Sequence, residues 1–260
     1  MRRRSGASSS RARSRELRVA HYARIDRDRA GRVGVPEVIL GEGKTVEHLL
    51  GILEALAAHG VGALVSRPTA AQRRAIRRAG PDSLDVTELA GGRLLRLAGP
   101  VGAEYRAGTA ALVTAGTSDV PLAEEAAGVL QVLGIRVVTA HDVGVAGLHR
   151  LLRAVRRLER HRPEIYLVFA GREGALPTVI AGLVRAPVVG VPSSVGYGRG
   201  GRGEAALSAM LQSCAPIAVV NIDAAVPAAL FAAQRFAVRT TEPRARAAAA
   251  GSVPRRTRRR

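Results

Sequence analysis

The chain has 260 residues, a formal net charge of +19 and one cysteine, and 47% of its residues are apolar. That length suffices for one large domain or two modest ones with a buried core. No apolar run approaches the ~20 residues of a membrane span, and the Arg- and Ser-rich start has no apolar segment like that of a secretory signal. A single cysteine excludes an intramolecular disulfide, so we expect a cytoplasmic protein without membrane contact.

Most of the positive charge lies at the two ends of the chain. Residues 1–18 carry a net charge of +6 and residues 239–260 a net charge of +7, with few apolar side chains in either. We therefore predict two basic, disordered tails. Lys44 is the only lysine, which is typical of a genome rich in G and C. This composition favours solvated tails over an arm that binds nucleic acid, although binding to acidic polymers stays open.

Residues 19–103 predict a small N-terminal α/β domain. Its expected strands are 37–40, 61–65, 83–86 and 93–97, and its expected helices are 45–58 and 69–78. The turn between the first strand and the first helix reads GEGKT, residues 41–45. A phosphate-binding P-loop would need glycine where Val38 stands. A solvent-exposed Lys44 is therefore the first interpretation, and phosphate contact by Lys44 the second.

Residues 104–238 predict a larger domain in which strands and helices alternate. The expected strands are 110–113, 135–139, 165–169, 188–191 and 217–222, and helices ending near 133, 159, 184, 212 and 236 follow them. Apolar strands with intervening helices indicate a parallel sheet covered on both faces. The sequence therefore predicts a doubly wound, three-layer α/β domain whose ligand lies beyond the carboxyl ends of the strands.

Polar side chains gather in the loops that follow these strands. We expect the site to draw on Thr117, Ser118, Asp119, Asp142, His149, Arg172, Glu173, Ser193, Ser194, Gly196, Tyr197 and Cys214. Turns rich in Gly and Ser suit phosphate oxygens because their backbone N–H groups are exposed. No His/Cys cluster has the spacing of a zinc site.

Three of these residues also have plain structural interpretations. Asp119 precedes Pro121 and is a natural N-cap for the next helix. His149 is equally consistent with a surface position on its helix. Cys214, between a helix and an apolar strand, is by itself more typical of an inert core residue than of a nucleophile.

Several blocks of residues resemble a known family. Five segments follow the order of motifs in the PurE family of aminoimidazole ribonucleotide carboxylases and mutases. They are AGTSD (115–119), AGLHR (146–150), AGREGALPTVIAGL (170–183), GVP (190–192) and MLQSCAPIAVV (210–220). The chain resembles the LarB family of nickel-pincer nucleotide biosynthesis proteins more closely, over about residues 22–237. That likeness adds RVGVPEVILGEGKT, PSSVGYG and the VVNID segment.

The resemblance implies a PurE-like fold and a carboxylase/hydrolase that acts on nicotinic acid adenine dinucleotide. It implies addition of CO2 at carbon 5 of the pyridinium ring and release of AMP, with CO2 or bicarbonate as a substrate and no tightly bound cofactor. Whether Mg²⁺ assists cleavage of the anhydride stays open. A homo-octamer is implied by analogy with PurE.

The same resemblance suggests roles for the candidate residues. Cys214 is the only thiol that can add to the ring as a nucleophile. Asp119 and His149 are candidates for proton removal or positioning. Arg172 is a candidate partner of the nicotinate carboxylate, and the remaining strand-end residues and Lys44 are candidates for substrate binding.

Two other functions are consistent with the sequence. A PurE-type carboxylase or mutase of purine biosynthesis would not need Cys214. A non-catalytic nucleotide-binding regulator would use its arginine tails on nucleic acid.

Overall fold

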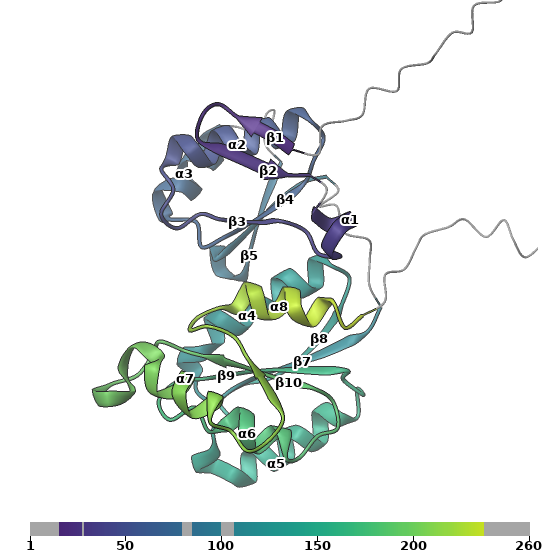
Figure 1. Ribbon diagram of the computed structural model, residues 1–260, viewed down its shortest axis with the longest axis vertical. Helices are drawn as coiled ribbons and strands as arrows, with labels where there is room; N and C mark the ends of the chain where they lie inside the picture. The colour runs from purple at the N-terminus through teal and green to yellow at the C-terminus, as the bar shows by residue number, and fades with distance from the viewer. Residues whose placement is uncertain (1–15, 28, 80–84, 100–106, 237–260) are drawn as a thin grey trace, which may run out of the picture.

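The computed structural model describes residues 16–27, 29–79, 85–99 and 107–236 (Figure 1). Within them the chain forms a smaller N-terminal sheet, a larger sheet and a hairpin. None of the helices in these residues is long and apolar enough to cross a membrane.

The larger sheet holds five parallel strands among the described residues, in the order β11-β10-β9-β7-β8. In chain order these are β7 (Thr109–Thr114), β8 (Arg136–Ala140), β9 (Ile165–Ala170), β10 (Val188–Pro192) and β11 (Ile217–Val219). Strands β9 and β10 are buried at every position, as expected for parallel strands covered on both faces. Numbered from β7, the order is the 2-1-3-4-5 of flavodoxin-like sheets, which confirms the predicted fold class.

Helices cover both faces of this sheet (Figure 1). Two apolar cores result, one on each face: α4 (Val120–Val132) and α8 (Ala225–Ala233) share the first, and α5 (Leu148–Glu159), α6 (Leu176–Ala181) and α7 (Glu204–Leu211) share the second. Helix α5 shows why a helix packs one face on the sheet. Leu151, Val155 and Leu158 are buried at helical spacing, while arginines occupy much of the rest of the helix surface.

The N-terminal sheet has the order β3-β4-β6-β5, with β3 and β4 parallel and the other pairs antiparallel. Its strands are β3 (Val38–Leu40), β4 (Ala63–Ser66), β5 (Val86–Leu89) and β6 (Leu94–Leu97), and its helices are α2 (Val46–Ala58) and α3 (Ala70–Arg78). Both helices start where threonine predicts a cap. Thr45 Oγ1 accepts from the His48 N–H at 3.2 Å, and Thr69 forms a capping box with Gln72.

Helices α4 and α8 lie between the two sheets (Figure 1). Leu64 of β4 and Leu94 of β6 belong to the same apolar core as α4 and α8, so the N-terminal sheet packs directly on the larger unit. Gly128 of α4 permits this approach, because a Cβ atom there would lie 2.9 Å from Leu94 Cδ2. The two units therefore share a core.

The structure corrects several expected boundaries. The chain forms a hairpin of β1 (Glu16–Val19) and β2 (Ala23–Asp26), followed by α1 (Arg29–Val33), in a region where no strand or helix was expected. Residues 16–18 were assigned to the disordered tail but form strand, since Leu17 and Val19 pack into the N-terminal core. The strand observed near the expected 83–86 is β5, Val86–Leu89, which pairs with β6, and residues 83 and 84 lie outside the described residues. The rest of both tails lies outside the described residues.

Candidate active site

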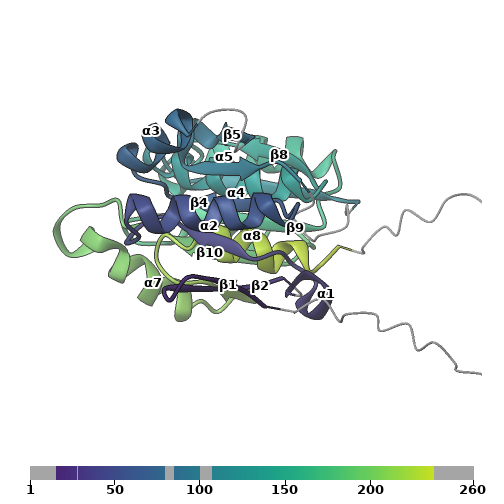
Figure 2. The same ribbon diagram turned by 90° about the horizontal axis from the view of Figure 1, so that it is seen from above.

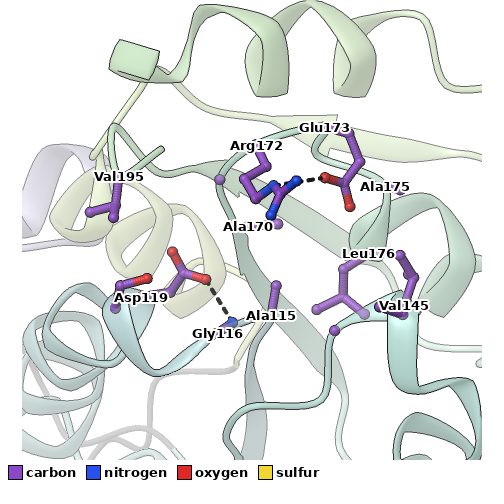
Figure 3. A pocket seen from close by; sticks show the side chains of 14 residues that line it. Ala115, Gly116, Asp119, Val145, Ala170, Arg172, Glu173, Ala175, Leu176 and Val195 are labelled. Carbon is purple, nitrogen blue, oxygen red and sulfur yellow. Dashed lines mark hydrogen bonds and ion pairs between the residues drawn. The ribbon is translucent and has the colours of Figure 1, made fainter. Parts of the chain in front are cut away.

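Four loops meet around a cavity at the carboxyl ends of the larger sheet (Figure 3). The loops follow β7, β8, β9 and β10, and the cavity volume is about 300 Å³. Chain connections leave β7 and β9 in opposite directions, and such a switch point is where doubly wound folds bind ligands. Short 3₁₀ segments, η2 (Thr117–Asp119) and η3 (Val145–Gly147), shape two of the loops.

Asp119 is the buried acid of this cavity. Its side chain is 3% exposed, and its Oδ2 accepts from the Gly116 N–H at 3.0 Å. The carboxylate makes no capping bond to α4, so it serves the loop after β7 and not the helix that follows. Burial raises the pKa of the Asp119 carboxyl above its ordinary value, and the nearby Asp223 adds to that rise. Hydrogen bonds from Gly116 and Ser193 act in the opposite direction without cancelling it.

Arg172 and Glu173 form another wall of the cavity, across from Asp119 (Figure 3). Arg172 Nε lies 3.8 Å from Glu173 Oε2, and both side chains are largely exposed. Arg172 has a φ of 49°, a conformation that non-glycine residues adopt mainly where the surroundings impose it. The Arg172 guanidinium also lies 4.8 Å from the ring centroid of Tyr197. The Arg172 guanidinium is thus held at the rim, where it can meet an anionic ligand.

The loop after β10 contains Ser193 and Ser194, and we call it the serine loop. Hydrogen bonds to Asp223 and within the loop hold it in place. The Ser194 N–H donates to Asp223 Oδ1 at 2.8 Å, and the Asp223 N–H donates to the Pro192 carbonyl at 2.8 Å. Ser193 is fully buried, and its Oγ accepts from the Val195 N–H at 3.2 Å. The loop presents Val195 to the cavity and keeps Ser193 beneath it, near Asp119.

The loop after β9 lies close against this serine loop. A Cβ atom at Gly171 would lie 2.2 Å from the Val195 carbonyl oxygen, so only glycine allows the two backbones to approach this far. The positions of Arg172 and Val195 on the cavity wall therefore depend on each other.

Arg67 connects the N-terminal unit to the same loops. Its Nη2 donates to the Asp223 carbonyl, and its Nε lies 3.6 Å from Glu125 Oε2 in α4. Glu42, in the GEGKT turn, lies 3.7 Å from Arg67 Nη1. Glu125 is fully buried and also accepts from Arg93 at 3.3 Å, so a charged cluster joins the two units beneath the serine loop.

Cys214 does not lie at this cavity. A smaller hollow beside the cavity is lined by Arg172, Glu173, Tyr197, Gly200 and Ala205. Cys214 is exposed, lines neither the cavity nor this hollow, and precedes β11, an edge strand of the sheet. Because α7 runs back along the sheet, the loop that follows it lies at the amino ends of the strands. Within a single chain this loop therefore does not open onto the cavity. The interpretation of Cys214 as a buried core residue is wrong, because the residue is exposed.

The other expected site residues divide in two. Ser118, Asp119, Arg172 and Glu173 line the cavity, and Tyr197 lines the hollow beside it. The remaining candidates do not line either space: Thr117, Asp142, His149, Ser193, Ser194, Gly196 and Lys44. His149 is exposed on the first turn of α5, and Asp142 pairs with Arg150 at 2.8 Å. Within the described ranges, no three His, Cys, Asp or Glu side chains are grouped as metal ligands.

Two polar residues near the cavity were missed from the sequence. Asp223 holds the serine loop, and His141 Nδ1 lies 3.4 Å from the buried Thr114 hydroxyl at the end of β7. Both follow the end of a strand, β11 and β8, so the rule that selected Asp119 applies to them as well. The apolar wall residues Val145, Leu176 and Val195 carry no comparable signal in the sequence.

Comparisons with known proteins agree with this architecture. The family model for AIR carboxylase matches residues 109–252, and that for the LarB/PurE-like N-terminal domain matches residues 17–94. A protein of Methanocaldococcus jannaschii, described as uncharacterized, is 38% identical over 82% of this chain and 84% of its own length. These matches cover both units of the fold.

Two relatives are described as N5-carboxyaminoimidazole ribonucleotide mutases. That of Methanocaldococcus jannaschii is 28% identical over 49% of this chain and 78% of its own length, and that of Pyrococcus abyssi is 31% identical over 50% and 75%. The match to the carboxylase model indicates an enzyme of the carboxylase or mutase type. This chain belongs to the AIR carboxylase family and carries, before that domain, a LarB/PurE-like N-terminal domain.

Proposed function

We propose that the protein carboxylates nicotinic acid adenine dinucleotide at carbon 5 of its pyridinium ring and hydrolyses the phosphoanhydride. The products are pyridinium-3,5-biscarboxylic acid mononucleotide and AMP. The N-terminal unit favours this substrate over the others of the family, because residues 17–94 match the model for the LarB/PurE-like N-terminal domain. Arg67 of this unit also donates a hydrogen bond to the carbonyl of Asp223, the residue that holds the serine loop. The mutase relatives align with only about half of the chain.

The chemistry requires a nucleophile because a pyridinium ring does not itself attack CO2. A thiolate adds to a ring carbon next to carbon 5, which neutralises the ring and leaves an enamine. Carbon 5 then forms the bond to CO2, a base removes the proton from carbon 5, and the electron pair expels the thiolate and restores the aromatic ring. Water finally attacks the pyrophosphate and breaks one P–O bond. Covalent addition thus divides one difficult step into easier ones.

Asp119 is the residue that we assign to proton removal. Its burial beside the cavity and its raised pKa bring the carboxylate closer in basicity to a useful general base. Ser118 and the Gly116 backbone lie on the same loop and line the same wall, where they suit a carboxylate or phosphate of the ligand.

Cys214 serves this reaction in our proposal from a second copy of the chain. The cavity of the same chain lies at the other end of the sheet, whereas the Cys214 thiol is exposed directly before the edge strand β11. Leu211, just before it in the chain, is 67% exposed. A homo-oligomer, an octamer in the PurE family that the sequence resembles, would bring that edge to a neighbour's cavity. The complete site would then contain Asp119 of one copy and Cys214 of another.

The test is incubation of the full chain with nicotinic acid adenine dinucleotide and ¹³C-bicarbonate, followed by mass spectrometry. We expect equal amounts of AMP and a mononucleotide that carries one ¹³C carboxylate. The same assay with Cys214→Ala should give neither product, while Ser208→Ala, an exposed change on the neighbouring helix α7, should give both. An intact dinucleotide after incubation with the unaltered protein would overturn the proposal.

A second candidate function, mutase or carboxylase activity on an aminoimidazole ribonucleotide, is favoured by the two mutase relatives. That substrate is already an enamine and needs no thiol. Turnover of N5-carboxyaminoimidazole ribonucleotide that survives in Cys214→Ala would select this alternative.

A further inference from the structure

A pocket lies between the N-terminal sheet and the larger unit, and we call it the junction pocket. Its volume is about 230 Å³, and its walls come from β5, β6 and α4. Strand β5 and helix α4 are neighbours in both views (Figures 1 and 2). Asp119 directly precedes α4 and Gln131 lies near its end, so ~18 Å of helix separate this pocket from the candidate active site. The lining residues are Thr87, Leu89, Arg96, Gly128, Gln131 and Val132.

The pleat of the N-terminal sheet turns three of these side chains toward α4. Leu94 and Arg96 share one face of β6 because they are two residues apart, and Leu94 belongs to the core that contains α4. Thr87 is the register partner of Arg96 across the β5–β6 pair, and Leu89 lies on the same face of β5. A guanidinium, a hydroxyl and an apolar side chain therefore face the last turns of α4.

Arg96 carries a charge that no acidic side chain in the described part of the chain neutralises. Its Nε is buried and has no hydrogen-bond partner there. Other arginines of this unit are paired: Arg93 lies 3.3 Å from Glu125 Oε2, and Arg77 pairs with Glu88. A buried N–H group without an acceptor is unfavourable, so an acceptor that enters the pocket would gain a hydrogen bond at little cost to the protein.

We propose that the junction pocket binds a small molecule with one carboxylate and a short apolar body. The Nε–H and one Nη–H of Arg96 donate to the two carboxylate oxygens, because the guanidinium fork matches their geometry. The Thr87 hydroxyl and the Gln131 amide line the same pocket and can donate as well. Leu89 and Val132, both partly buried against the core around α4, contact the apolar body. This binding is independent of carboxylation of the dinucleotide.

Size and charge favour this class of ligand over larger molecules and over phosphates. Pockets for drug-sized ligands measure about 300–1,000 Å³, so the junction pocket suits a smaller molecule. One arginine is its only cationic lining residue. Gln131 and Val132 belong to the last turn of α4, where the helix dipole places partial negative charge. Arg96 can neutralise a single carboxylate, whereas a doubly charged phosphate would keep excess charge beside that helix end.

The experiment measures binding of 3-methylbutanoate to the full chain by saturation-transfer NMR, with uncharged 3-methylbutanamide and inorganic phosphate as comparison ligands. Arg96→Gln removes the charge, and Gln131→Glu places a negative charge on the opposite wall at an exposed position. Arg74→Gln, exposed on α3 and outside the pocket, is the matched control for the loss of an arginine. Arg172→Gln tests whether the probe occupies the candidate active site instead. Circular dichroism verifies the fold of each variant.

We expect the unaltered protein to bind the carboxylate with a Kd of about 0.1–10 mM. The amide should bind about tenfold more weakly or less, and Arg96→Gln and Gln131→Glu should each weaken the carboxylate by about tenfold or more. Arg74→Gln and Arg172→Gln should keep the affinity. If Arg96→Gln does not fold, Gln131→Glu alone decides.

Four results would overturn the inference. They are no binding by the unaltered protein at ~50 mM carboxylate, unchanged affinity in Gln131→Glu or in a folded Arg96→Gln, loss of binding in Arg172→Gln, and phosphate or amide binding as tight as that of the carboxylate. None of these results bears on carboxylation, which the ¹³C assay measures separately.

Discussion

The two ends of the five-stranded sheet differ in what they offer chemically. At the carboxyl ends, four loops bring together a buried acid, Asp119, an arginine and a cavity of about 300 Å³. At the amino ends, the loop before β11 carries the chain's only thiol, exposed and away from both hollows. One copy of the chain therefore holds the base and the nucleophile of the proposed reaction at opposite ends of one sheet.

In the proposed reaction, the base and the nucleophile must therefore come from different copies of the chain. Loops after strands converge at a switch point, so polar residues placed there meet within a single chain. Loops before strands diverge from that point, and a residue there reaches a ligand only across an interface.

Asp119→Asn should lower carboxylation by about 10²- to 10⁴-fold, the usual contribution of a general base. The fold should survive, because the amide oxygen can still accept from the Gly116 N–H. The raised pKa of Asp119 means that the folded protein disfavours its ionised form, so ionisation costs stability as pH rises through that pKa. We therefore expect the melting temperature of Asp119→Asn to match that of the unaltered protein near pH ~4 and to equal or exceed it near pH ~8.

Two results would contradict the role and the pKa direction assigned to Asp119. Full activity in Asp119→Asn would remove Asp119 from the reaction. A melting temperature that falls below that of the unaltered protein only at the higher pH would contradict the sign of the pKa shift.

Gly171→Ala should reduce activity by about tenfold, because the added Cβ forces apart the loops after β9 and β10. The overlap is with a backbone carbonyl, which cannot rotate away, so we also expect a stability loss of about 1–3 kcal/mol. Gly182→Ala is the matched control, since its Cβ would meet the nearest atom at an ordinary 3.5 Å. Equal activity in both variants would show that the spacing of these loops does not matter.

Arg67→Lys should have the smallest effect, a rise of about two- to tenfold in KM for the dinucleotide with kcat little changed. Lysine keeps a positive charge near Glu125 but cannot contact Glu42, Glu125 and the Asp223 carbonyl together. Equilibrium unfolding of the same variant provides the control for a purely structural role. A fall in stability with an unchanged KM would mean that Arg67 joins the two units without positioning the serine loop.

The sequence predicted the larger unit well because each strand is a short apolar run followed by a loop with Gly and polar residues. Helix α5 ends at Glu159, as expected, and helices α2 and α3 begin directly after Thr45 and Thr69, the first residues of the expected helices. The hairpin of β1 and β2 was not expected, because each strand is only four residues long and half of its residues are charged. Only the pairing of the strands and their packing in the N-terminal core reveal them.

The candidate site was predicted in part for a related reason. Asp119, Arg172 and Glu173 follow strands directly, and topology alone brings them together. Cys214 was placed at the wrong end because its segment was considered without the direction of α7. Arg67 was missed because its partners, Glu125 and Asp223, are 58 and 156 residues away in the chain, and no local pattern links them.

In the proposed oligomer, one copy supplies Asp119 and another supplies Cys214. The most direct measurement is to coexpress Asp119→Asn and Cys214→Ala chains with different tags, purify the mixed oligomer and assay carboxylation of the dinucleotide. If the site is shared between copies, about a quarter of the sites receive both intact residues and about a quarter of the normal activity returns. If each chain uses its own cysteine, every site lacks one group, and the mixture stays as inactive as either variant alone.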